Sequence, residues 1–218
     1  AICAVVLRIN SSGGTLGAAQ SLADGLLRIK TELSAPLLCF VGEQALSAAF
    51  YVALCADELM VTRSALLGSV GAIQQYYSVK ELARRIGIDV RTFSRGKHKG
   101  GTSPFEEISD EQTQAIQSTL DETTAHFTEW IAGRRPRATL NPEQWAALSA
   151  VLTGGRCVEL GLADRVGGLF DVLDRARELG AVTTSPGLLR VSVDDRSQPS
   201  TPLNWLMKFA IERLLPSR

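Results

Sequence analysis

The feature that most constrains this chain is a repeated order of apolar run, turn and helix. Residues 2–9 are apolar and rich in β-branched side chains without strict alternation, which is typical of a strand buried on both faces of a sheet. A glycine-rich turn follows, and residues 18–30 then place apolar side chains at helical spacing. Further strands are predicted at 37–41 and 57–62, around a small-residue helix at 45–56. This order predicts an α/β domain with a parallel sheet.

The segments that follow extend this pattern. Ser109 and the two acidic residues after it predict the capped start of a long helix that runs to about Gly133. The polar, glycine-rich residues 94–104 are predicted as a loop. Other predictions are a strand at 90–93, a loop or strand edge at 68–73, a turn-rich segment at 154–168, and helices at 79–86, from Asn141, and at 169–179.

The composition changes after Gly180 to Thr, Ser, Pro and Gln. We therefore predict a flexible linker at 181–201 and an amphipathic helix at 202–218. The polar face of that helix is short and weakly basic, which favours docking within or between subunits over membrane anchoring. Residues 1–180 then form one domain. Because the chain enters a strand directly from Ala1, we expect that this domain is truncated at its N-terminus.

Charge and composition argue against several classes of protein. The 23 Lys and Arg residues balance 23 Asp and Glu residues, which gives no basic surface charge for nucleic acid or an anionic membrane. No apolar run approaches the ~20 residues of a membrane span, so we expect membrane contact only through a missing upstream segment. The four cysteines have apolar neighbours and no CxxC pair, which favours buried free thiols and a reducing compartment. We predict no metal site, because there are only two histidines.

Three loops carry residue types that could do chemistry. The Gly13-Gly14 turn follows a predicted parallel strand, at the sheet edge where α/β proteins bind ligands. Ser47 stands at the start of the small-residue helix, and Lys97-His98-Lys99 lie in the polar loop. Each also has a plainer interpretation, respectively a simple turn, a helix N-cap and a solvated basic surface.

Taken together, four segments in this order resemble the signal peptide peptidase A family of Ser/Lys serine proteases, which includes phage prohead and capsid-assembly proteases. The resemblance covers about residues 2–180, including Gly154 to Asp164, and implies a Clp protease/crotonase-like α/β fold with repeated ββα units. The segments are Ile9-Asn10-Ser11-Ser12-Gly13-Gly14, Ser47 to Ala53 with Ala56-Asp57-Glu58, Gly68-Ser69-Val70-Gly71, and Gly96-Lys97-His98-Lys99 with Ser103-Pro104-Phe105.

The resemblance implies a role for six residues. Ser47 matches the nucleophile and Lys99 the general base, 99 − 47 = 52 positions later. Ser69 matches the hydroxyl that orients the lysine, while Gly13, Gly14 and the N–H of Ala48 match the oxyanion hole. A lysine ordinarily titrates near ~10.4, so it must be desolvated before it can accept the serine proton.

Two other residues of this loop could act as the base. Lys97 competes with Lys99 for the role of base. Only the match to the family's register favours Lys99. His98 would suggest a Ser-His-Asp triad, but no second motif supports one, so we interpret it as structural or facing the substrate.

The sequence departs from the family pattern at three places, all of which leave the Ser/Lys pair intact. Ser12 replaces a proline, Ala48 and Ala49 replace glycines after the nucleophile, and Gly100 replaces an aspartate. Alanine restricts the backbone, so the oxyanion hole survives only where no positive φ is needed. The alternative is therefore a catalytically weakened or inactive homologue that serves as an oligomeric assembly subunit. A crotonase-type acyl-CoA enzyme is a third possibility, with no use for a Ser/Lys pair.

The expected function is an endopeptidase that cleaves peptides or protein segments through an acyl-enzyme, without a cofactor. The resemblance implies signal-peptide remnants or phage scaffold and capsid proteins as substrates, and a homo-oligomer in which neighbouring chains share a site. Its place would be membrane-associated in a bacterial cell, or in the host cytoplasm or phage prohead. A cut within residues 182–201 by the enzyme itself is also expected.

Overall fold

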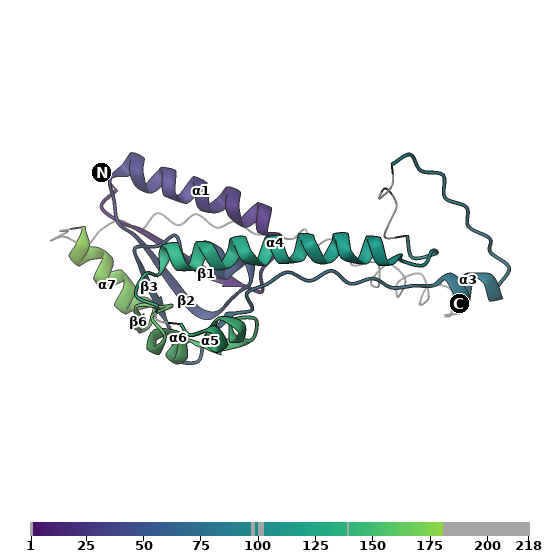
Figure 1. Ribbon diagram of the computed structural model, residues 1–218. Coiled ribbons are helices and arrows are strands. Elements are labelled where there is room, and N and C mark those ends of the chain that lie inside the picture. Colours follow the sequence, from purple (N-terminus) through teal and green to yellow (C-terminus); the bar gives the residue numbers. More distant parts are fainter. Residues whose placement is uncertain (1, 97–98, 100–102, 139, 181–218) are drawn as a thin grey trace, which may run out of the picture. The chain divides into compact units, whose positions relative to one another are not determined.

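The computed structural model describes residues 2–96, 99, 103–138 and 140–180 (Figure 1). The predicted linker at 181–201 and the predicted helix at 202–218 lie outside the described residues. The strands are β1 (Val5–Ser11), β2 (Leu37–Leu46), β3 (Glu58–Val61), β4 (Leu66–Gly68), β5 (Val151–Thr153) and β6 (Arg165–Val166). The helices are α1 (Leu16–Leu33), α2 (Ala48–Ala53), α3 (Lys80–Arg85), α4 (Asp110–Arg134), α5 (Pro142–Ala147), α6 (Gly154–Glu159) and α7 (Leu169–Leu179).

The strands form one sheet in which β2 is the central member. Its order is β5-β4-β2-β3-β6, and β1 also pairs with β2. The pairs of β2 with β1, β3 and β4 are parallel, as is β3 with β6, whereas β4 and β5 are antiparallel. The predicted α/β class with a mainly parallel sheet is confirmed.

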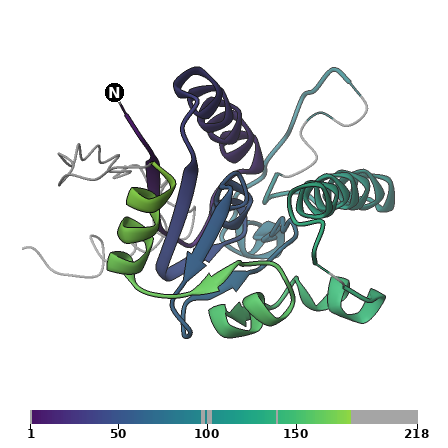
Figure 2. The ribbon, with the colours of Figure 1, turned by 90° about the vertical axis from the view of Figure 1, so that its left-hand side faces the viewer.

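Both faces of β2 are buried, as its unbroken apolar sequence predicts. Leu37, Cys39 and Val41 belong to the larger core, which also holds side chains of α1, α2 and α4. Leu38 and Phe40 point to the opposite face, where they pack with Val172 and Ala176 of α7. Figure 2 shows α1 and α7 on either side of β1 and β2. Full burial of a Leu, Val or Phe side chain among these contributes about 1.5–3 kcal/mol to the free energy of folding, before the entropy cost of ordering it.

Helix caps follow the sequence closely. The Ser109 hydroxyl accepts a hydrogen bond from the amide of Gln112, at 3.2 Å, and the Gln112 side chain accepts one from the amide of Ser109, at 2.8 Å. This reciprocal pair is a capping box, so the predicted N-cap of α4 is confirmed.

Several predicted boundaries are wrong. Residues 90–93 form no strand; they are exposed, and no described strand pairs with them. The segment at 154–168 contains α6 and β6 in addition to turns, and β2 runs on to Leu46, so the small-residue helix begins only at Ala48. A strand needs a partner as well as β-branched residues, and the partner is not readable from a local window.

The cysteine prediction holds for three of four residues. Cys39, Cys55 and Cys157 are buried thiols, whereas Cys3 is exposed. Burial raises the pKa of Cys55 to about 11 and that of Cys157 to about 12. In the part of the chain that the structure describes, no helix combines the length and the apolar character that crossing a membrane requires.

Candidate active site

The turns that follow β1 and β2 touch each other. The two strands are parallel, and Ser11 of β1 lies opposite Ala45 of β2, so their carboxyl ends reach the same edge of the sheet. Gly13 follows with φ of +111°. A Cβ atom on Gly13 would lie 2.8 Å from the carbonyl oxygen of Leu46 and 2.9 Å from the Cβ atom of Ser47. Only glycine fits this contact without displacing backbone.

Ser47 occupies a strained position between β2 and α2. Its φ of 51° and ψ of −125° lie outside the regions that L-residues favour, at a cost of about 1–3 kcal/mol. Its amide donates to the carbonyl of Gly68 at 2.8 Å, and its carbonyl accepts from the amides of Phe50 and Tyr51 at 2.8 and 3.1 Å. Among the described hydrogen bonds, none joins the Ser47 hydroxyl to the α2 backbone. The backbone is thus held firmly, while the side chain does not serve as the N-cap that the plainer interpretation expected.

Ser69 is placed beside the Ser47 turn by its neighbour. The Gly68 carbonyl accepts the Ser47 amide, and the Ser69 amide donates to the carbonyl of Ala150 at 2.9 Å. Ser69 also has a positive φ, 53°. The Gly68-Ser69 segment is therefore fixed between the Ser47 turn and the chain that leads into β5.

The alanines after Ser47 do not need the freedom of glycine. Ala48 and Ala49 are buried in the first turn of α2, and neither has a positive φ. Ala48 is the first helical residue, whose N–H has no acceptor within a helix. The left-handed conformation falls on Ser47 instead. Replacing the family's glycines with alanine is therefore compatible with the backbone of this turn.

Gly14 differs from Gly13. It is exposed, its φ is not positive, and a Cβ atom there would meet nothing within 4 Å. The structure thus brings Gly13, Ser47, Ala48 and Ser69 together and leaves Gly14 at the rim of this group.

Lys99 is not part of this group in the single chain. It is exposed, its backbone amide donates to the carbonyl of Gly96 at 3.2 Å, and none of its described contacts involves Ser47. Lys97, His98 and Gly100 lie outside the described residues.

The residues on either side of Lys99, 72–96 and 103–108, are referred to here as the arm. Two parts of the arm are tied together, because the amide of Val79 donates to the carbonyl of Pro104 at 2.7 Å and Lys80 pairs with Glu107 at 3.0 Å. The arm exposes many large apolar side chains, which the sequence pattern did not single out. Those at least half exposed are Ile73, Tyr77, Leu82, Ile86, Ile88 and Phe93.

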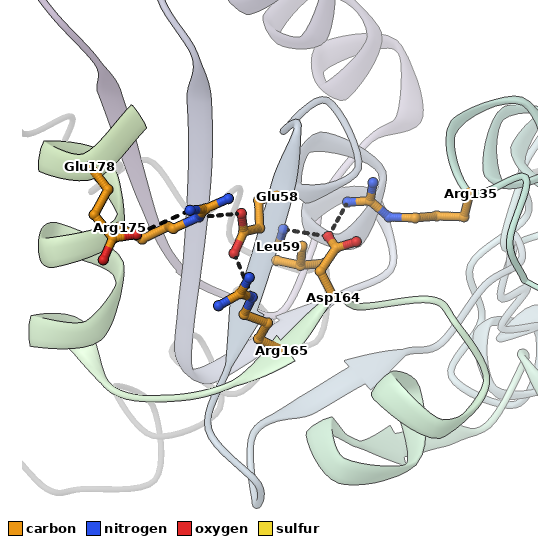
Figure 3. A network of polar contacts seen from close by, with 7 residues as sticks. All are labelled: Glu58, Leu59, Arg135, Asp164, Arg165, Arg175 and Glu178. Atoms are coloured by element: carbon orange, nitrogen blue, oxygen red, sulfur yellow. Dashed lines mark hydrogen bonds and ion pairs between the residues drawn. The ribbon is translucent and has the colours of Figure 1, made fainter. Parts of the chain in front are cut away.

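Asp57 and Asp164, which belong to segments that carry the family resemblance, have a structural role. The Asp57 carboxylate accepts from the amide of Leu37 at 3.0 Å and pairs with Lys30. The Asp164 carboxylate accepts from the amide of Leu59 at 2.7 Å and lies 3.8 Å from the guanidinium of Arg135 (Figure 3). These carboxylates fix the starts of β2 and β3, and the Ser47 turn follows the opposite end of β2.

Glu58 forms the second half of the polar network in Figure 3. Its two carboxylate oxygens each lie 3.0 Å from an arginine Nε, one in Arg165 and the other in Arg175. Arg175 belongs to α7, and Glu58 begins β3. The network therefore joins α7 to the sheet on the face opposite α2.

Comparison with known proteins places the chain in a family. Residues 30–183 match the description "Peptidase family S49". A relative from Methanocaldococcus jannaschii is 27% identical over 191 residues, which are 88% of this chain and 60% of the relative. "Serine protease SPPA, chloroplastic" from Arabidopsis thaliana is 26% identical over 92% of this chain and 29% of its own length. "Capsid assembly protease C" of Escherichia phage lambda is 23% identical over 80% of this chain and 39% of its own length. The chain thus spans less than two thirds of the length of each of these relatives.

Proposed function

Because the chain belongs to peptidase family S49, and its fold is of the Clp protease/crotonase-like α/β class, we propose that it is a serine endopeptidase with Ser47 as nucleophile. The observation that carries this proposal is the contact between Gly13 and the strained Ser47 turn. A nucleophile on a rigid turn, with N–H groups of two chain segments nearby, is the arrangement that acyl transfer needs.

In the proposed reaction the Ser47 hydroxyl attacks the scissile carbonyl and passes its proton to Lys99. The N–H groups of Ala48 and of the Gly13-Gly14 turn stabilise the negative charge on the carbonyl oxygen. Lys99 returns the proton to the leaving amine, which gives an acyl-enzyme that water then hydrolyses. Ser69 orients the lysine. The reaction needs neither metal nor cofactor.

Assembly of several chains would complete this site. A lysine can serve as the base only where a neighbouring surface removes water from it. The arm that carries Lys99 exposes apolar side chains of the kind that gather at protein interfaces. We therefore propose a homo-oligomer in which the arm packs against a neighbouring chain and Lys99 meets a Ser47 turn.

The substrates proposed are extended protein segments. One relative is named a capsid assembly protease and another a serine protease. Together with the resemblance to signal peptide peptidases, these names support signal-peptide remnants, or phage scaffold and capsid proteins, as the substrates. With signal-peptide remnants as substrates, the protein would act at the membrane of a bacterial cell. With phage proteins as substrates, it would act in a phage prohead.

Peptide hydrolysis by matched variants tests the proposal. Lys99→Ala should lower kcat by about 10²–10⁴-fold, the range that general acid–base groups contribute. Ser47→Ala removes the nucleophile and should lower kcat by about 10⁶-fold. Lys97→Ala is the matched control and should keep wild-type activity. Activity that survives in Ser47→Ala would contradict the assignment, and loss in Lys97→Ala alone would move the base to Lys97. A folded assembly that hydrolyses no peptide would favour the non-catalytic assembly subunit.

A further inference from the structure

Helix α2 starts at the nucleophile and needs support from outside, because it is only six residues long. One turn joins Ser47 to Tyr51, since the Tyr51 amide donates to the Ser47 carbonyl at 3.1 Å. The carbonyls of a helix's last turn have no N–H donor within the helix. Whatever binds these carbonyls therefore fixes the orientation of α2 and of the turn at its start.

Trp130 of α4 supplies that support. Its indole N–H donates to the Tyr51 carbonyl at 3.0 Å. Its ring also stacks on the Tyr51 ring, with centroids 4.6 Å apart and an interplanar angle of 7°. The Arg134 guanidinium lies over the Trp130 ring, 4.4 Å from its centroid. Trp130 therefore holds Tyr51 by both its backbone and its side chain.

The residue that ends α4 fixes the chain just beyond α2. Arg135 is only 7% exposed, and its guanidinium donates to the carbonyls of Ala56 and Leu162 at 3.4 and 3.2 Å. Figure 3 shows the Asp164 carboxylate between this guanidinium and the amide of Leu59. The last turns of α4 are thus anchored to the start of β3 while they contact α2.

We propose that Trp130 is a positioning residue for Ser47, acting through Tyr51. This inference rests on the proposed function, because it assumes that Ser47 is the nucleophile. Without the indole N–H, the Tyr51 carbonyl loses its donor, and α2 is free to shift against α4. A displacement of about 1 Å at a reacting group can cost about 10²-fold in rate, so a small shift matters.

The test compares Trp130→Phe with Trp145→Phe. Each change removes one indole N–H and keeps an aromatic ring, but Trp145 lies on α5 and takes no part in the described contacts of Tyr51. Peptide hydrolysis gives kcat and KM, thermal unfolding gives Tm, and amide hydrogen exchange reports on Phe50 and Tyr51. We expect Trp130→Phe to lower kcat about 10-fold with KM unchanged. Exchange at Phe50 and Tyr51 should rise, with Tm close to that of Trp145→Phe.

Different outcomes distinguish failure of the positioning role of Trp130 from failure of the proposed function. An active wild type, together with a Trp130→Phe variant whose kcat and amide exchange match those of Trp145→Phe, would overturn the positioning role and leave the proposed function standing. A fall in kcat that only follows a large fall in Tm would also overturn it, because the loss would then be one of folding. A folded, assembled wild type that hydrolyses no peptide would overturn the proposed function, and the positioning role with it.

Discussion

A Cβ atom on Gly13 would lie 2.9 Å from the Cβ atom of Ser47, so the turns after β1 and β2 meet with no room for another side chain. The contact joins segments 34 positions apart, since 47 − 13 = 34. It places the first turn, at Gly13, beside the residue proposed as nucleophile. The geometry of the proposed oxyanion hole therefore depends on the absence of a side chain at Gly13.

Gly13→Ala should damage both activity and stability. The positive φ and the close Leu46 carbonyl each oppose an alanine, and we expect a loss of about 1–3 kcal/mol in the free energy of unfolding. Urea unfolding and peptide hydrolysis measure the two effects. Gly25→Ala is the control, because Gly25 lies inside α1 with open space around it, and it should gain about 0.5–1 kcal/mol. Equal stability of the two variants would contradict this account.

Asp164→Asn should destabilise the fold by leaving Arg135 without its counter-charge. Loss of one partner from a buried ion pair costs about 3–5 kcal/mol, and we expect about 2 because the Asp164 side chain is 31% exposed. The measurement is urea unfolding. Asp171→Asn is the matched change, because among the described residues Asp171 accepts from the Gly168 amide alone, at the exposed start of α7. It should cost under about 1 kcal/mol. A smaller loss for Asp164→Asn than for Asp171→Asn would argue against the buried pair.

The cysteines should differ in reactivity and give a stability that falls at high pH. Iodoacetamide at pH 8 should modify the exposed Cys3 of the native protein, and the three buried thiols only in denaturant.

Burial raises the pKa of Cys55 from 9.0 to about 11, so above pH 9 the unfolded chain loses a proton that the folded chain keeps. The free energy of unfolding should therefore fall between pH 9 and 11. In Cys55→Ala this free energy should fall less steeply with pH. An identical slope in the variant and the wild type would refute the raised pKa of Cys55.

Activity should depend on protein concentration through the arm. Phe93→Glu places a charge at a side chain that is 93% exposed in the single chain, and it should reduce both the assembly measured by ultracentrifugation and the hydrolysis rate per chain. Phe170→Glu is the control, because Phe170 is 80% exposed but lies on α7. If Phe170→Glu dissociates the assembly and Phe93→Glu does not, the interface is not on the arm.

The sequence predicted elements well wherever their signals are local. Helix α7 was predicted at its observed bounds because apolar periodicity and flanking glycines define it, and the cap of α4 is a four-residue pattern. The strand predicted at 90–93 is wrong because β-propensity does not supply a partner strand. Helix α6 and strand β6 were missed, since six and two residues are too few to show a period.

The candidate site divides in the same way. The Ser47 turn and Gly13 follow from motifs at the ends of neighbouring parallel strands, and the structure brings them into contact. The support of α2 by Trp130 was not predicted, because stacking between residues 79 positions apart leaves no local pattern. The proposed meeting of Lys99 with a Ser47 turn depends on assembly, which one chain's sequence pattern does not encode.

Covalent labelling tests the central claim most directly. The assembled protein is treated with a serine-reactive fluorophosphonate and the adduct is mapped by mass spectrometry, for wild type, Ser47→Ala, Lys99→Ala and Lys97→Ala. We predict an adduct on Ser47 that forms in wild type and Lys97→Ala and is lost in the other two variants. An adduct on a different serine, or labelling of Ser47 that is unaffected by Lys99→Ala, would contradict a Ser47/Lys99 dyad.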